Sequence, residues 1–309
     1  MTVSEFPTVR PPLDEPRRSV GAMRTLRDLI ALTKPRITGL VLMTEATGMV
    51  VAPGSTTLRC RALSLVGTLL IVASANTFNM WWERDVDARM ERTRDRPLPA
   101  GRLSPDVALA FGLALGAVSL PLLLLVNGTT ALLGFAALVS YVLVYTPLKP
   151  HTYLALLVGA VPGAMPPLMG WATITGSVGV GGWLLFALLF LWQIPHFAAI
   201  SVFRAEDYAR AGLSVVSVQH GEGAARRMIV FWTALLVVCS MLFGPAGLAG
   251  RTYELVAAVL GATFLALTLR GFHPNARIQT SRWARRVFAF SIVYLTVLLL
   301  VLVADKTLL

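Results

Sequence analysis

Long apolar segments recur along the whole chain, separated by short polar stretches. A helix needs about 20 mostly apolar residues to cross the hydrocarbon core of a bilayer. A window of that length predicts nine transmembrane helices, the third and fourth separated only by the turn sequence NGT. The fold class is therefore all-α, a polytopic membrane bundle. The predicted spans are residues 37–53, 62–82, 105–126, 130–147, 152–172, 182–203, 227–248, 253–270 and 286–304.

The basic residues fall in alternate loops of this nine-span pattern. Of 27 Lys and Arg residues, only Arg59, Arg61, Arg251 and Lys306 lie in one set of loops, and the rest lie in the other set. Loops rich in Lys and Arg stay on the cytoplasmic side of a membrane. We therefore expect the N-terminus to be cytoplasmic and the C-terminus to lie outside.

The composition supports a membrane protein. The 309 residues are 56% hydrophobic and 14% charged, whereas soluble domains carry about 25% charged residues. The net charge of +11 could indicate a nucleic-acid binder. Because the basic residues are divided among loops between apolar spans, we expect the lipid bilayer as partner and no nucleic acid. Cys60 and Cys239 match no metal or redox spacing.

The first 33 residues are polar and rich in proline. They lack the apolar core of a signal peptide, and their four acidic residues are atypical of a mitochondrial presequence. We expect residues 1–33 to form a disordered and interfacial cytoplasmic arm, and residues 34–309 to form the nine-helix domain. These features favour the bacterial inner (plasma) membrane.

An unusual polar motif ends the second predicted span. Asn79, Glu83 and Asp87 are spaced four residues apart, so on a helix each lies about 40° round and about 6 Å along from the last. One helix face would then display a carboxamide and two carboxylates. Such hard oxygen ligands suit Mg²⁺, which often shares its coordination with substrate phosphates. Asp85 would point to the opposite side.

Two further polar clusters are predicted on the same side of the membrane. Glu206 and Asp207 follow the sixth span, and Tyr145 and Lys149 lie four residues apart at the end of the fourth. Facing carboxylates could hold a diphosphate through Mg²⁺, and a lysine or arginine can bind its oxygens. The candidate diphosphate-binding residues are Lys149, Tyr145, Arg89, Arg92, Arg96 and Arg204.

At these motifs the chain resembles the UbiA superfamily of intramembrane prenyltransferases, which have nine helices and two aspartate-rich motifs. Within it, RTRDRPLPAGR and DYARAG resemble the branch that farnesylates haem, rather than the quinone and chlorophyll branches. The matching stretches are LTKPRI at 32–37, NMWWERDVDARMERTRDRPLPAGR at 79–102, YTPLK at 145–149, GAMPPLMGWA at 163–172, IPHF at 194–197 and EDYARAGLSVVSV at 206–218.

The resemblance implies roles for these residues. The family motif NxxxDxxxD falls on Asn79, Glu83 and Asp87, where Glu83 replaces the usual aspartate. The second motif falls on Glu206 and Asp207, and these five residues are the expected Mg²⁺ ligands. Of them, Asn79, Glu83, Asp87 and Asp207 are the expected catalytic residues.

The implied reaction transfers farnesyl from farnesyl diphosphate to the vinyl group of haem B, giving haem O for haem–copper oxidases. Haem A synthase or oxidase assembly factors are candidate partners. His196 is the candidate haem contact, because a polar residue at membrane depth is a functional candidate. It could equally bond a backbone carbonyl freed by Pro195.

Three other activities would leave different features in the sequence. An ion-coupled transporter would show inverted repeats and midplane acids, whereas here the acids gather at one rim. A CDP-alcohol phosphotransferase would carry a DGxxAR…GxxxDxxxD pattern, which the chain lacks. A prenyltransferase acting on an aromatic quinone precursor remains the nearest alternative.

Overall fold

The computed structural model describes residues 21–273 and 279–308, and this part of the chain contains helices and no strand. The predicted all-α class is confirmed. The helices are α1 (Ala22–Leu32), α2 (Pro35–Val51), α3 (Leu58–Asp87), α4 (Pro105–Val126), α5 (Gly128–Val139), the π-helix η1 (Ser140–Tyr145), α6 (Thr146–Leu148), α7 (Ala155–Thr175), α8 (Val180–Phe203), α9 (Ala205–Arg210), α10 (Val216–Gln219), α11 (Gly221–Met241), α12 (Arg251–Leu269), the 3-10 helix η2 (Arg270–Phe272) and α14 (Thr280–Leu308).

Within the described residues, eight helical segments of at least 18 residues are apolar enough to cross a membrane. They correspond to the second to ninth predicted spans, with α5, η1 and α6 forming one of them. The first predicted span is α2, whose 17 residues lie at the short end of the range for membrane helices. The chain is a multi-pass membrane protein.

Several span boundaries differ from the predicted ones. Helix α3 extends five residues beyond the predicted end at 82, so the acidic motif lies on one continuous helix. Helix α11 ends at Met241, seven residues before the predicted end at 248, because the sequence FGPAGLAG that follows forms turns. Of the predicted arm, residues 1–20 lie outside the described residues and Ala22–Leu32 form α1.

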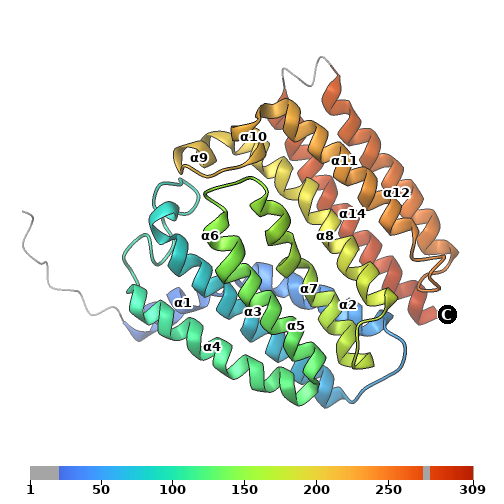
Figure 1. Ribbon diagram of the computed structural model, residues 1–309, viewed down its shortest axis with the longest axis horizontal. Helices are drawn as coiled ribbons and strands as arrows, with labels where there is room; N and C mark the ends of the chain where they lie inside the picture. The colour runs from blue at the N-terminus through green and yellow to red at the C-terminus, as the bar shows by residue number, and fades with distance from the viewer. Residues whose placement is uncertain (1–20, 274–278, 309) are drawn as a thin grey trace, which may run out of the picture.

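The long helices pack side by side into one bundle (Figure 1). Helix α8 contacts α7, α11 and α14, and α14 returns to contact α2. The largest apolar core lies around α8, with Leu185, Leu188 and Ala198 nearly inaccessible. The C-terminus of α3, the short helix α6, and α9 and α10 lie at the same end of the bundle (Figure 1). We call this the site end.

Helices α2 and α7 approach each other closely at two glycines. A Cβ atom on Gly48 would lie 2.1 Å from the carbonyl oxygen of Pro167, and one on Gly170 would lie 2.0 Å from that of Glu45. Real Cβ atoms do not approach backbone atoms so closely. The two helices can therefore pack in this way only because these positions carry no side chain.

We expect Gly48→Ala to destabilise the protein by about 1–3 kcal/mol, since overpacking forces backbone shifts of that cost. Gly39→Ala is the matched control on the same helix, because nothing lies within 4 Å of a Cβ there. The free energy of unfolding of Gly39→Ala should equal that of the wild type or exceed it by up to about 1 kcal/mol, since alanine has a higher helix propensity than glycine. Thermal unfolding of both purified variants measures the difference, and equal midpoints would contradict the assigned α2–α7 contact.

Candidate functional site

The acidic motif forms one buried column on α3. Asn79 is 2% exposed, Glu83 7% and Asp87 3%, and all three follow the fourfold spacing of the helix. Asp85 points away from this column, with its side chain 79% exposed. The geometry that the spacing predicts is therefore confirmed, and the column is the centre of the candidate site.

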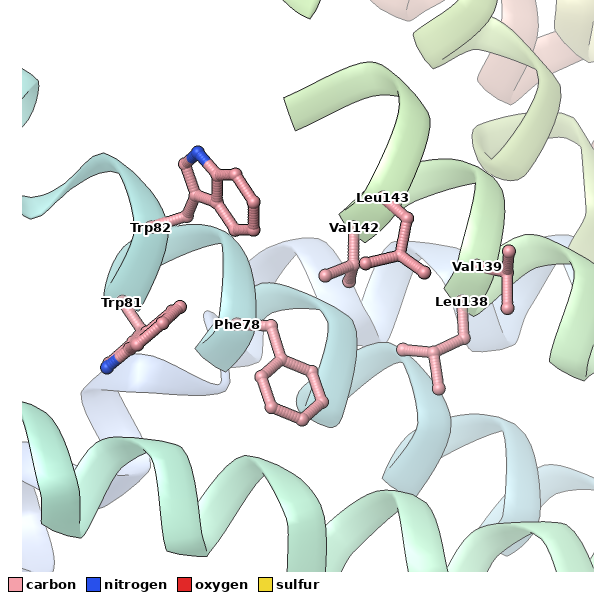
Figure 2. Close-up of a pocket in the computed structure, with 7 residues that line it drawn as sticks. All are labelled: Phe78, Trp81, Trp82, Leu138, Val139, Val142 and Leu143. Carbon is pink, nitrogen blue, oxygen red and sulfur yellow. The ribbon is translucent and has the colours of Figure 1, made fainter. Parts of the chain in front are cut away.

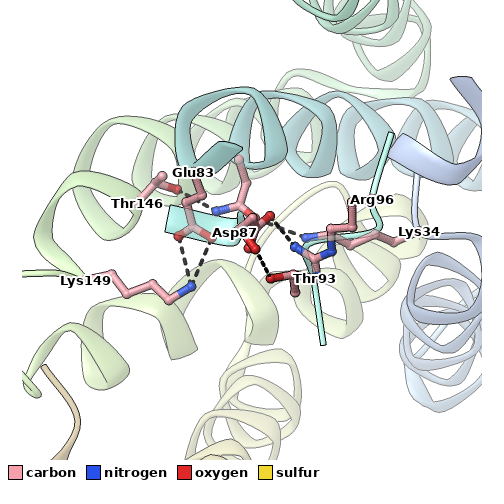
Figure 3. A network of polar contacts seen from close by, with 8 residues as sticks. Lys34, Glu83, Asp87, Thr93, Arg96, Thr146 and Lys149 are labelled. Atoms are coloured by element: carbon pink, nitrogen blue, oxygen red, sulfur yellow. Dashed lines mark hydrogen bonds and ion pairs between the residues drawn. The ribbon is translucent and has the colours of Figure 1, made fainter. Parts of the chain in front are cut away.

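Lys149 pairs with Glu83 across the site. Its Nζ donates to both carboxylate oxygens of Glu83, at 2.9 and 3.0 Å (Figure 3). Lys149 directly follows α6, which continues from the π-helix η1, and π-helical segments are frequent at functional sites. Thr146 fixes this segment by donating its hydroxyl to the carbonyl oxygen of Tyr141 at 2.8 Å. The predicted diphosphate ligand Lys149 thus lies directly against the acidic column.

Arg96 pairs with Asp87 from the loop that follows α3. Its Nη1 donates to Oδ2 of Asp87 at 2.6 Å, and the hydroxyl of Thr93 donates to the Asp87 carbonyl oxygen at 2.8 Å (Figure 3). The loop folds back because the Pro97 carbonyl oxygen accepts bonds from the backbone N–H groups of Arg102 and Leu103. This turn holds Arg96 over the C-terminus of α3.

Lys34 also lies at the site, although its sequence position predicts no role for it. Its Nζ donates to Oδ1 of Asn79 at 3.1 Å, and the Asn79 amide donates to Thr146 Oγ1 at 3.3 Å. Lys34 joins α1 to α2 with φ +48°, the one positive φ of a non-glycine residue in the described part. Such strained backbone conformations cluster at functional sites. Its place in LTKPRI, just before a proline that starts a span, was the available signal.

The pKa values of the two lysines beside the column shift in opposite directions. Burial, together with the charges of Arg96 and Lys149, lowers the pKa of Lys34 to about 7. Burial also opposes the charged form of Lys149, but Tyr145 and Glu83 beside it outweigh burial and raise its pKa above the ordinary value. Lys149 therefore stays charged, and an anion placed next to Lys34 would favour its charged form too.

The second acidic motif packs against the end of the first. Helix α9 places Asp207 at 5% exposure, where its Oδ1 accepts from the Glu91 backbone N–H at 3.1 Å and from Arg210 at 3.2 Å. Met90 and Leu213 pack together beside it. The other oxygen, Oδ2 of Asp207, is buried and has no hydrogen-bond partner among the described residues.

The remaining predicted site residues lie around this centre. Tyr145 is half-buried, and its ring fits because Gly159 has no side chain: a Cβ there would lie 2.6 Å from it. The others are exposed and form no ion pair in the described part of the chain; they are Arg89, Arg92, Arg204 and Glu206. Of the second acidic motif, Asp207, the expected catalytic residue, is buried, whereas Glu206 is exposed.

His196 lies in α8, seven residues before the end of the helix, and is 9% exposed. Its Nδ1 lies 2.7 Å from the hydroxyl of Ser291 on α14. The alternative bond to a carbonyl freed by Pro195 is therefore not the contact that forms.

The donor set of the site fits Mg²⁺. No group of three or more His, Cys, Asp and Glu side chains gathers closely enough to hold a metal within residues 21–273 and 279–308. However, Mg²⁺ is usually held by one or two carboxylates plus substrate phosphates, not by an all-protein cage. Glu83 and Asp87 supply two carboxylates, and the unpartnered Oδ2 of Asp207 is a buried oxygen that a cation would satisfy.

An apolar pocket of about 260 Å³ also borders α3. Phe78, Trp81 and Trp82 line it from α3, and Leu138, Val139, Val142 and Leu143 line it from α5 and η1 (Figure 2). At 100° per residue, Phe78 and Trp81 lie about 140–160° round α3 from the centre of the acidic column, and Trp82 lies about 100° from it. This pocket is therefore separate from the candidate site.

The model of the UbiA prenyltransferase family matches residues 41–293. A protein named protoheme IX farnesyltransferase from Anaeromyxobacter dehalogenans is 50% identical over 282 residues, 91% of this chain and 94% of that protein. One of the same name from Sorangium cellulosum is 55% identical over 238 residues, 77% of this chain and 84% of that protein.

Solved structures share the fold. A digeranylgeranylglyceryl phosphate synthase aligns with a TM-score of 0.79 at 17% identity, covering 93% of this chain and all of that one. A UbiA homolog from Archaeoglobus fulgidus, bound to GPP and Mg²⁺, aligns with a TM-score of 0.62 at 18% identity, covering 87% and 99%.

Proposed function

The chain belongs to the UbiA prenyltransferase family, and on this premise we propose that it transfers the farnesyl group of farnesyl diphosphate to a vinyl group of protohaem IX (haem B), giving haem O and diphosphate. The observation that carries the proposal is the identity of about half the residues, over nearly the whole chain, with relatives named protoheme IX farnesyltransferase. The buried column of Asn79, Glu83 and Asp87 supports it, because it is ringed by bases suited to a diphosphate.

The diphosphate binds where Lys34, Arg96 and Lys149 meet the acidic column. Each of these bases now bonds a side chain of the column, so each can turn from that partner to a phosphate oxygen. The other proposed diphosphate ligands border them: Tyr145, Arg89, Arg92 and Arg204. Asn79, Glu83, Asp87 and Asp207 would hold Mg²⁺, with Glu206 at their edge, and bound Mg²⁺ would stabilise negative charge on the leaving diphosphate.

The transfer breaks the C1–O bond of farnesyl diphosphate, and the electron pair leaves with the diphosphate. The vinyl group of haem B gives its π electrons to C1, and water then adds to the resulting cation and loses a proton. The charges of Arg96 and Lys149 stabilise the departing anion where its charge develops. An apolar bundle limits premature attack of water on C1. His196 is the proposed contact to the haem.

The proposal includes an orientation of the protein in the membrane. The C-terminal end of α3 and the loop that follows it, at the site end, carry six arginines between Arg84 and Arg102, and loops rich in Lys and Arg stay on the cytoplasmic side. We place the site at the cytoplasmic face of a bacterial inner membrane, with the N-terminus inside and the C-terminus outside. Farnesyl diphosphate, which is charged at one end, then reaches the site from the inner leaflet.

The test is the product formed by the purified protein with Mg²⁺ and farnesyl diphosphate. With haem B, mass spectrometry should find a product heavier by a farnesyl group plus one hydroxyl, and exhaustive chelation should abolish it until Mg²⁺ is restored. With 4-hydroxybenzoate, no prenylated product should form. Prenylation of 4-hydroxybenzoate with haem B left unchanged would overturn the haem assignment in favour of a quinone precursor.

A further inference from the structure

His196 is held in one orientation between α8 and α14. The ring of Trp192 stacks on it at 4.6 Å and 26°, and that of Phe288 packs at 4.7 Å and 35°. Two rings at these distances cannot share one face of an imidazole, so they lie on opposite faces. The imidazole can therefore contact a further group only through its edge.

Ser291 determines which nitrogen of His196 carries the proton. The Ser291 hydroxyl donates its one proton to the Phe288 carbonyl oxygen at 2.6 Å, because a carbonyl can only accept. The Ser291 oxygen, 2.7 Å from Nδ1 of His196, therefore accepts from an Nδ1–H group. Trp192 fixes the same turn of α14 by donating to the Ser291 carbonyl oxygen at 2.6 Å.

This tautomer leaves Nε2 of His196 with an unused lone pair. Across residues 21–273 and 279–308, no hydrogen bond reaches Nε2, and Nε2 is not among the fully buried unpartnered atoms. A histidine that ligates a metal typically donates its other N–H group to a fixed acceptor, which sets the tautomer and the ring orientation. His196 has this arrangement, with Ser291 as the acceptor.

We propose that Nε2 of His196 is an axial ligand of the haem iron of the substrate and that Ser291 is its positioning residue. This inference rests on the proposed function and deepens it. His196 lies seven residues before the end of α8, which is about 10 Å along the helix from the point where α9 begins and carries Asp207. An iron–nitrogen bond there fixes the flat porphyrin beside the diphosphate site, so that a vinyl group can be held near C1.

The test is the spectrum of ferric haem B bound to the purified full-length protein without farnesyl diphosphate. Absorption, resonance Raman and electron paramagnetic resonance spectra should show histidine ligation in the wild-type protein. His196→Ala should lose that signature, and added imidazole should restore it. The controls are the other three histidines of the chain, which are exposed: His151→Ala, His220→Ala and His273→Ala should leave the spectrum unchanged.

Ser291→Ala provides a second variant that keeps the histidine. Loss of an outer-shell partner should weaken haem affinity by about 10–100-fold while histidine ligation persists at saturating haem. Any one of three results would overturn the inference. They are a wild-type complex whose spectra show no histidine ligation, spectra of histidine ligation retained by His196→Ala, and a haem affinity unchanged in Ser291→Ala. Failure of the proposed function is distinguishable, because wild-type protein would then form no farnesylated haem whatever its spectrum.

Discussion

Replacing Asp87 by asparagine should lower farnesyl transfer to haem by more than about 100-fold, because loss of even an outer-shell partner of a metal costs about 10–100-fold and Asp87 is a proposed direct ligand. Asparagine keeps the shape of the side chain and one acceptor oxygen for Arg96, which now bonds Oδ2 at 2.6 Å. The change removes a negative charge from the column and leaves Glu83 as the remaining carboxylate on that helix face.

Asp85→Asn is the matched control for this prediction. It makes the same chemical change two residues away on the same helix, at a side chain that is 79% exposed and points away from the column. Turnover should stay close to wild type, and thermal unfolding should show both variants folded. Equal activity of the two variants would remove Asp87 from the metal site.

The period of the motif was enough to predict the column itself. Three polar residues spaced by four must share a helix face, and their burial on α3 follows once that face turns into the bundle. The same reasoning placed Asp85 on the opposite side. Local chain geometry determines these features, so they could be read from the sequence without knowledge of the tertiary structure.

The partners of the column could not be predicted in the same way. Lys34 lies 45 positions from Asn79, and Lys149 lies 66 positions from Glu83, so both contacts depend on how whole helices pack. Among the arginines after α3, the path of the loop decides that Arg96 reaches Asp87 while Arg92 is exposed. These arginines carry the same charge and lie in the same loop, so the sequence does not show which of them reaches Asp87. The turn at Pro97 decides this by holding Arg96 over the end of α3.

The hydrogen-bond partner of His196 could not be predicted from the sequence either. The sequence marked it as a polar residue at membrane depth, but its partner Ser291 lies 95 positions away on α14. A serine in an apolar helix carries no sign of this role, because its hydroxyl can always bond a carbonyl of its own helix. The tautomer of His196, which determines what the ring can bind, therefore emerges only when α8 and α14 are packed together.

The second large effect is expected at Asp207. Its Oδ1 is satisfied by the Glu91 backbone N–H, but Oδ2 is buried without a partner in the described part of the chain. An unpaired buried carboxylate oxygen is costly, and a cation would remove that cost. Asp207→Asn places an amide N–H₂ group where a metal needs an oxygen, so it should lower turnover by at least about 10-fold and raise the Mg²⁺ concentration needed for half-maximal activity.

Glu206→Gln tests whether only the buried carboxylate of the second acidic motif binds Mg²⁺, or whether the exposed one does so too. Glu206 precedes Asp207 on α9 but is exposed and forms no ion pair among the described residues. Its replacement should leave both turnover and Mg²⁺ dependence near wild type. If Glu206→Gln had the larger effect, the cation would bind on the exposed side of α9, and the unpartnered oxygen of Asp207 would have no part in holding it. The Mg²⁺ titration thus separates two neighbouring carboxylates that the resemblance to the family marks as metal ligands, of which only Asp207 is expected to be catalytic.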